Sequence, residues 1–308
     1  MIELIKPTFS QEEVFSDCIE NIIKEKEKLI EKKTLLNDSY RKYEELANIN
    51  ELHNFLDPLV NLDESIQENF KKLYKNKFSK DGHKARKYYN NIKNYKTKQD
   101  KTPIIHFNDE HNICPMCHTS EVDTLDHYLP KSKYPSLSIN PLNLIPICNK
   151  CNKNKGAYSS SCREKNLIHL YFDEFSNISW LKCEINSKYN IKEKCINMEI
   201  DFSVKQDETN IDRKELLYRI NNTFKKYKID KAYEIEAQHN FQNLIQSYTS
   251  IFSSNGEKAL REAVDDRFKH YDSKKGWELA FYHALITQEI WDEFIVALKN
   301  YLINSTFS

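Results

Sequence analysis

Four cysteines arranged as two C-x-x-C pairs are the residues whose type and spacing most clearly suggest chemistry. The pairs are Cys114 with Cys117 and Cys148 with Cys151, and 30 residues lie between them. Two such pairs can present four thiolates tetrahedrally to one Zn²⁺ ion. Four cysteines close the ligand shell, so the pattern predicts a structural zinc, since a catalytic zinc keeps an open position. The competing interpretation is four ordinary buried or free cysteines.

Polar residues that could serve hydrolysis lie inside the cysteine loop and just after it. Asp126 and His127 are adjacent, Asn143 follows, and Asn152 comes directly after the last cysteine. A neutral imidazole, with an ordinary pKa of about 6.5, can accept a proton from water near pH 7. The oxygens of Asp126 and Asn152 are hard ligands that favour Mg²⁺ or Mn²⁺ over a second zinc. Each residue alone has an ordinary interpretation as a surface, capping or turn residue, so the hypothesis depends on their order.

That order resembles the HNH family of ββα-metal nucleases over residues 114–156, with Asn152 as the third letter of an H-N-N variant. The resemblance implies that His127 is the base and that Asp126 and Asn152 hold the catalytic Mg²⁺ or Mn²⁺. It also implies that Asn143 orients the loop that carries His127. Three lysines are candidate phosphate contacts: Lys131, Lys133 and Lys155.

The stretches LDHYLPKSKYPSL and NLIPICNKCNKNKG further resemble the HNH subunits of bacterial Septu-type anti-phage systems, the PtuB-like proteins. Those subunits act with a partner ATPase of the ABC/SMC type. This chain has no G-x-x-x-x-G-K-[ST] loop, so an ATP-driven step would have to come from a partner. The resemblance implies a metal-dependent endonuclease that acts on DNA more readily than on RNA, as the effector of such a system.

A second class of function stays open at this stage, namely a non-catalytic zinc module that binds nucleic acid or a partner protein. The intact Asp126–His127 pair favours the nuclease, because a binding module has no need of it. RNA also stays open as a substrate, since the motif contacts a phosphodiester and does not read the sugar.

The rest of the chain predicts an α+β fold that is predominantly α. Gly is scarce at 4 residues and Pro at 8, which favours helices, and six of the prolines fall in residues 103–160. We expect a helical region over 1–102, a loop-rich ββα-metal module with its zinc over 103–165, and a short β-hairpin followed by helices over 166–308. Ser10 to Glu13 fits a helix capping box, and the segments 180–186 and 196–204 fit the hairpin.

Charge is balanced over the whole chain but not along it. Lys+Arg and Asp+Glu number 46 each, which argues against a uniformly basic coat. Residues 71–105 nevertheless hold 12 Lys or Arg against two Asp, interleaved with aromatic residues. This segment is either a solvated helix face or a nucleic-acid-binding face, with Lys84, Arg86 and Lys87 as candidate contacts. No signal peptide or membrane span is evident, so we expect a cytoplasmic protein.

Overall fold

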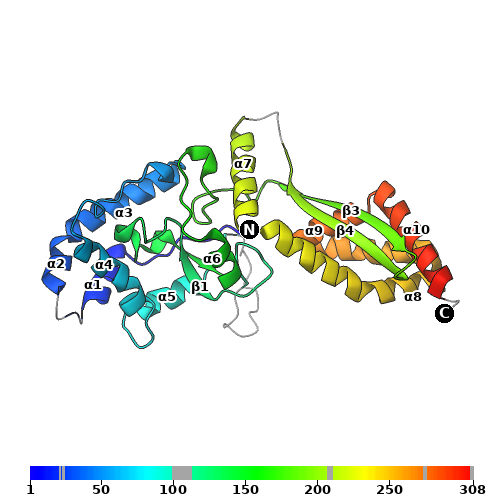
Figure 1. Cartoon of the computed structure of the whole chain (residues 1–308), viewed down its shortest axis with the longest axis horizontal. Coiled ribbons are helices and arrows are strands. Elements are labelled where there is room, and N and C mark those ends of the chain that lie inside the picture. Colours follow the sequence, from blue (N-terminus) through cyan, green and yellow to red (C-terminus); the bar gives the residue numbers. More distant parts are fainter. Residues whose placement is uncertain (21, 23–24, 99–112, 207–210, 273–275, 306–308) are drawn as a thin grey trace. The chain divides into compact units, whose positions relative to one another are not determined.

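The computed structural model describes residues 1–308 except 21, 23–24, 99–112, 207–210, 273–275 and 306–308 (Figure 1). The chain divides into two compact units. Unit 1 comprises Met1–Ile178 with Thr209–Tyr227, and unit 2 comprises Ser179–Glu208 with Lys228–Ser308. Helices dominate and two small antiparallel sheets accompany them, which confirms the expected α+β, predominantly α fold.

The sequence predicts three segments, at 1–102, 103–165 and 166–308, from changes in composition along the chain. The two units are instead defined by which residues pack together. The predicted boundary at 102/103 lies outside the described residues, and unit 1 includes the chain on both sides of it. The predicted boundary at 165/166 falls inside unit 1 as well. The N-terminal helices and the cysteine-containing module are therefore one compact body.

Unit 1 is built mainly of short helices around the loop-rich module. Its α-helices are α1 (Gln11–Ile19), α2 (Lys26–Glu31), α3 (Lys33–Asn48), α4 (Glu64–Leu73), α5 (Arg86–Lys93), α6 (Asn149–Lys155) and α7 (Ile211–Lys226). A π-helical turn, η2 (Tyr74–Phe78), follows α4 directly, and its 3-10 turns are η1 (Leu52–Asn54), η3 (Pro135–Leu137), η4 (Pro141–Asn143) and η5 (Arg163–Lys165).

Local sequence explains where several of these helices begin and end. Ser10 and Glu13 form the predicted capping box, in which each side chain accepts a hydrogen bond from the other residue's backbone N–H at the start of α1. The basic segment is not one continuous helix, because it is interrupted between η2 and α5. Gly82 lies in that interruption with a φ of 75°, a conformation that glycine adopts without strain.

The central module of unit 1 consists of two short strands and a helix. Strand β1 (Thr124–His127) pairs antiparallel with β2 (Leu144–Ile147), and the register places His127 opposite Leu144. Helix α6 follows at once, with Cys148 as its N-cap. Leu144 and Ile147 are fully buried, so this small sheet is anchored in the core of unit 1. The predicted ββα arrangement is therefore present.

Unit 2 is a long hairpin covered by helices. Strands β3 (Leu181–Asn190) and β4 (Cys195–Val204) pair antiparallel along their whole length. Burial alternates along β3, as expected for a strand with one face against a core. The covering helices are α8 (Ile229–Asp272), which contains a non-helical residue at Gly256, α9 (Trp277–Leu285) and α10 (Gln288–Ser305). Among the described residues, no helix is long and apolar enough to cross a membrane.

Candidate active site and metal centre

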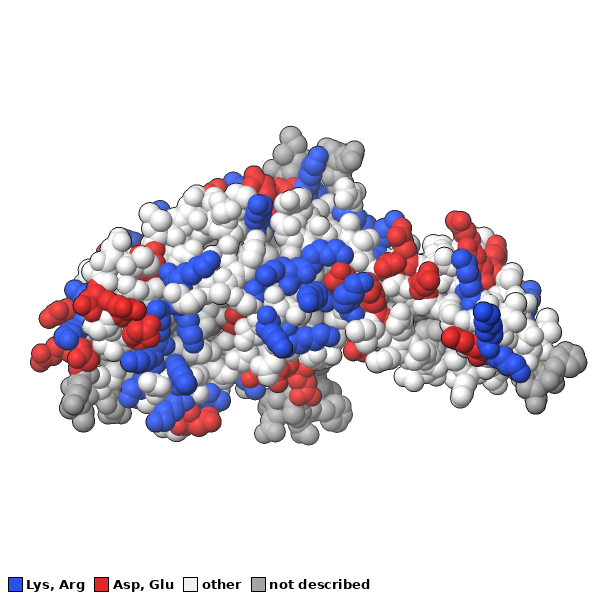
Figure 2. All heavy atoms as spheres, in the orientation of Figure 1, with Lys and Arg blue, Asp and Glu red and all other residues white. Residues whose placement is uncertain are grey.

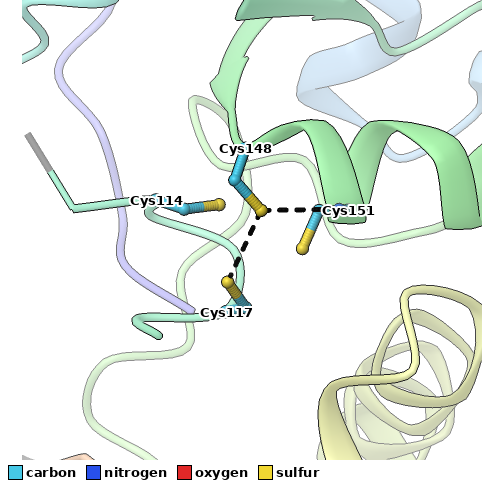
Figure 3. A group of neighbouring side chains, drawn as sticks. All are labelled: Cys114, Cys117, Cys148 and Cys151. Atoms are coloured by element: carbon cyan, nitrogen blue, oxygen red, sulfur yellow. Dashed lines mark hydrogen bonds between the residues drawn. The ribbon is translucent and has the colours of Figure 1, made fainter. Parts of the chain in front are cut away.

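The four cysteines meet in one buried cluster (Figure 3). Cys114 and Cys117 come from the turn before β1, Cys148 directly follows β2, and Cys151 lies in the first turn of α6. Their sulfur atoms all lie within 4.8 Å of one another, and those of Cys117 and Cys148 are 3.8 Å apart. Four thiolates at a Zn–S distance of about 2.3 Å around one ion would be roughly 3.8 Å apart. The donor set and its spacing therefore fit a closed, structural zinc site.

Hydrogen bonds of the backbone hold the four cysteines close together. The Cys114 amide donates to the Ser120 carbonyl, and the His118 amide donates to the Cys114 carbonyl, which folds residues 114–120 into a tight turn. The Cys148 sulfur accepts a hydrogen bond from the Cys151 amide at 3.4 Å. The helix start and the strand end thus already point their thiols at the turn.

His127 ends β1 in a buried position with a defined tautomer. Its Nε2 lies 2.9 Å from the Ser138 carbonyl oxygen, which can only accept, so Nε2 carries the proton and Nδ1 does not. The Tyr74 ring meets the imidazole edge to face, with centroids 4.6 Å apart. Burial lowers the pKa of His127 to about 3, and the Lys131 cation contributes to that lowering. The imidazole is therefore neutral near pH 7, which is the form that a general base requires.

Asp126 precedes His127 and is buried against a lysine. Its Oδ2 lies 2.9 Å from the Nζ of Lys155, which makes a buried ion pair between the carboxylate and the ammonium group. Burial raises the pKa of Asp126, and the Lys155 cation opposes that rise. Lys155 also donates to the His127 carbonyl at 2.6 Å.

Asn143 connects the start of β2 to the loop that follows His127. Its Oδ1 accepts from the Leu129 amide at 2.8 Å, and its Nδ2 donates to the carbonyls of Leu129 and Leu137 at 3.0 and 3.3 Å. Its own carbonyl accepts from the Tyr128 amide. These contacts are the ones that an orienting residue would need.

Asn152 lies on α6, half-buried, and three residues before Lys155. Residues three apart share a helix face, and Lys155 on that face reaches Asp126 in β1. The Asn152 side chain makes no hydrogen bond to the described residues. Its role as a ligand of the catalytic ion stays a prediction.

The other predicted contacts divide into two groups. Lys131 is half-buried, with Nζ 4.4 Å from the centroid of the Tyr74 ring that also meets His127. Burial and the neighbouring Lys75 lower the pKa of Lys131. Lys133 is exposed and donates to the Ser159 hydroxyl.

Lys84, Arg86 and Lys87 have carboxylate partners elsewhere in unit 1. Lys84 lies 3.0 Å from Asp17 and from Glu20, and Lys87 lies 2.9 Å from Asp17. Arg86 pairs with Asp81 at 3.2 Å. Lys84 and Lys87 therefore contact the end of α1, and Arg86 contacts the loop that precedes α5. The role of all three residues in binding nucleic acid stays a prediction.

Two groups around His127 could not be identified from the sequence. Tyr74 is one of several aromatic residues in a basic segment, and nothing in its spacing places it on His127. The Ser138 carbonyl is a backbone group and carries no sequence signal at all. Both reach His127 through tertiary packing of η2 and of the loop before η4.

The module consists of two antiparallel strands, a helix that follows them and a four-cysteine centre, which together make a ββα fold with a zinc-type ligand set. A carboxylate and a histidine, Asp126 and His127, lie at the end of its first strand. The family that matches residues 114–157 is described as HNH endonuclease. This part of the chain is therefore an HNH domain, which implies a nuclease-type function.

Two curated proteins also match. Protein ea31 of Escherichia phage lambda is 30% identical over 105 residues, which cover 33% of this chain and 31% of that protein. Septu protein PtuB of Bacillus thuringiensis is 36% identical over 64 residues, which cover 21% of this chain and 24% of that protein. The chain thus spans less than a third of the length of either relative. No solved structure matches.

Proposed function

We propose that this chain is a metal-dependent endonuclease that hydrolyses phosphodiester bonds of nucleic acid, with DNA preferred over RNA. The observation that carries the proposal is the state of His127. Its Nε2 proton is held by the Ser138 carbonyl, which leaves Nδ1 free to take a proton from an attacking water.

Asp126 and Asn152 would hold the divalent ion. The Asp126 carboxylate and the Asn152 carboxamide are hard oxygen donors, which suit Mg²⁺ or Mn²⁺. When bound, such an ion supplies Lewis-acid stabilisation of charge on the phosphate and the leaving oxygen. Asn143 keeps the loop after His127 in register with β2, so that the base holds a fixed position.

Lys131 and Lys75 would hold the scissile phosphate. Neither has a carboxylate partner among the described residues, and the charge of Lys75 is close enough to affect Lys131. The Tyr74 ring contacts both Lys131 and His127, so a phosphate on Lys131 would lie on the side of the base. An anion there would relieve the repulsion between the two ammonium groups.

We further propose that the chain is the effector of a bacterial anti-phage system and works with an ATPase of the ABC/SMC type. The partial similarity to the Septu protein PtuB supports this, as do the helices of unit 1 and unit 2 outside the HNH domain, which offer surface for a partner. The competing function is a non-catalytic zinc module that binds nucleic acid or protein.

The test compares wild type, His127→Ala and the surface control His239→Ala on plasmid DNA and on total cellular RNA. Zinc-replete protein is assayed with Mg²⁺ or Mn²⁺ and without either ion. We expect DNA cleavage that needs the added ion and is abolished only in His127→Ala, with zinc content unchanged. Cleavage that His127→Ala retains would contradict the proposal, as would no cleavage by wild type alone or with a co-expressed candidate ATPase.

A further inference from the structure

Lys155 is the most deeply buried charged side chain of the HNH domain. It ends α6, its side chain is 0% exposed, and its ammonium group contacts Asp126 Oδ2 at 2.9 Å and the His127 carbonyl at 2.6 Å. Burying an ammonium group costs several kcal/mol unless an opposite charge and hydrogen bonds compensate. Both of its partners belong to the two residues at the centre of the candidate active site.

The position of that ammonium conflicts with an ion on Asp126. Two cations cannot share a carboxylate oxygen at 2.9 Å in a buried site without strong repulsion. Conversely, a buried carboxylate without any cation is destabilised by the loss of hydration. The Asp126 pocket therefore needs one cation at a time.

We propose that Lys155 is a built-in counter-ion, which holds the Asp126 carboxylate in place until a divalent ion binds there and then moves away. The proposal rests on the metal role of Asp126 in the proposed function. It extends that function by giving the chain a folded state that does not depend on the divalent ion.

The end of α6 lies at the protein surface. Gly156, with a φ of 58°, terminates the helix, and Gly156 and Ala157 are both exposed. A lysine carries its charge at the tip of a flexible four-carbon stem, so the ammonium can move while the backbone stays in place. Its departure also frees the His127 carbonyl, which couples ion binding to the strand that carries the base.

The first experiment measures Mn²⁺ affinity by calorimetry on the zinc-loaded full chain. Lys155→Met is compared with wild type and with Lys153→Met, an exposed lysine on the same helix. We expect Lys155→Met to bind Mn²⁺ on the order of tenfold more tightly, since coupling of about 1.4 kcal/mol between adjacent groups is ordinary. Its Tm without Mn²⁺ should fall and should recover when Mn²⁺ is added. Unchanged or weaker Mn²⁺ binding by Lys155→Met would overturn the proposal.

The second experiment reads the movement itself. Wild-type protein is acylated with an amine-reactive ester with and without Mn²⁺, and Lys155 is followed by peptide mass spectrometry. We expect Lys155 to be protected without Mn²⁺ and labelled with it, while Lys153 is labelled in both. A Lys155 that stays protected at saturating Mn²⁺ refutes the displacement. Mn²⁺ binding that survives Asp126→Asn would instead overturn the metal site of the proposed function, which separates the two failures.

Discussion

The neutral state and the tautomer of His127 are set by its neighbours. An exposed histidine would be partly protonated near pH 6.5, whereas here burial lowers the pKa to about 3. The Ser138 carbonyl fixes which nitrogen carries the proton, and the Tyr74 ring covers one side of the imidazole. At the scale of single residues, the site therefore depends on groups that never touch a phosphate.

Tyr74 tests this dependence. Its hydroxyl donates to the Leu125 carbonyl, and its ring contacts His127 and Lys131. We expect Tyr74→Phe to keep the ring contacts and lose about 1 kcal/mol of stability with the hydrogen bond. Tyr74→Ala should lower the rate of nucleic-acid cleavage by roughly 100-fold, because a small misplacement of a catalytic group has that effect. The measurement is single-turnover cleavage by the two variants at equal zinc content, and equal rates for Phe and Ala would show that the ring does not position His127.

His169 gives a prediction about acid stability. It is buried among aromatic rings, its Nδ1 accepts from the Tyr171 amide, and its Nε2 contacts the Tyr43 hydroxyl. Burial, and then the Arg219 cation, lower its pKa to about 3. Because the folded pKa lies below the unfolded value of about 6.5, protonation of His169 opposes folding. The fold therefore has its full stability above pH 6.5. That stability declines as pH falls from about 6.5 towards 3, at about 1.36 kcal/mol per pH unit.

We therefore expect His169→Gln to flatten the pH dependence of the free energy of unfolding. At pH 5 the wild type should be less stable by about 2 kcal/mol through this one residue, and the variant should show none of that decrease. Urea unfolding at several pH values between 7.5 and 5 measures the slope, with exposed His239→Gln as the matched control. The prediction fails if the slopes of His169→Gln and wild type coincide, whatever their absolute stabilities.

At the scale of elements, the four-cysteine centre connects the turn at 114–120 with the point where β2 ends and α6 begins. Strands of four residues bury too little surface to be stable alone, so the module depends both on the core of unit 1 and on the ion for its folding energy.

Cys148→Ser should therefore release zinc and unfold the β1–β2–α6 module. Cys148 is both a ligand and the N-cap of α6, so its replacement affects the ion and the helix together. Zinc content by mass spectrometry and thermal unfolding by circular dichroism measure the effect. Cys195→Ser, in β4 of unit 2 and outside the cluster, should keep full zinc and the wild-type Tm. A Cys148→Ser variant that binds a full equivalent of zinc would contradict the structural role.

The elements that could be predicted from sequence are those defined by nearby residues. The capping box at Ser10, the two C-x-x-C turns and the hairpin depend on contacts within a few positions or on strand periodicity. The π-helical turn contacts β1 through Tyr74, whose hydroxyl donates to the Leu125 carbonyl, and periodicity does not record such a contact.

The candidate site follows the same division. The order of His127, Asn143 and the cysteines can be read from the sequence because the family pattern is local. The charge of Lys155 predicts a phosphate contact, whereas the structure buries that lysine against Asp126. Sequence likewise gives no partner for Lys84 and Lys87, because Asp17 lies far from them along the chain.

At the scale of the whole molecule, zero net charge requires that any hold on nucleic acid be local. Figure 2 shows Lys and Arg gathered over unit 1 where Figure 1 labels α6. The contacts of three segments define this basic surface. Lys226 lies over the Tyr158 ring, Lys133 donates to Ser159, and Asn154 donates to the Tyr227 carbonyl. Lysines of the surface without a carboxylate partner among the described residues are Lys133, Lys150, Lys153 and Lys226.

The salt dependence of DNA binding should therefore follow this basic surface and not the α5 face. In a His127→Ala background, Lys150→Gln with Lys153→Gln should weaken binding to a short duplex. It should also reduce the slope of log affinity against log salt by roughly 2, about 0.9 for each phosphate that the protein no longer neutralises. Lys84→Gln with Lys87→Gln removes the same charge but leaves Asp17 and Glu20 without these cations, so its slope should stay near that of the parent. Fluorescence anisotropy across a NaCl series measures both. If the second pair changes the slope and the first does not, the basic segment 71–105 is the binding face, and its ion pairs with α1 open when DNA arrives.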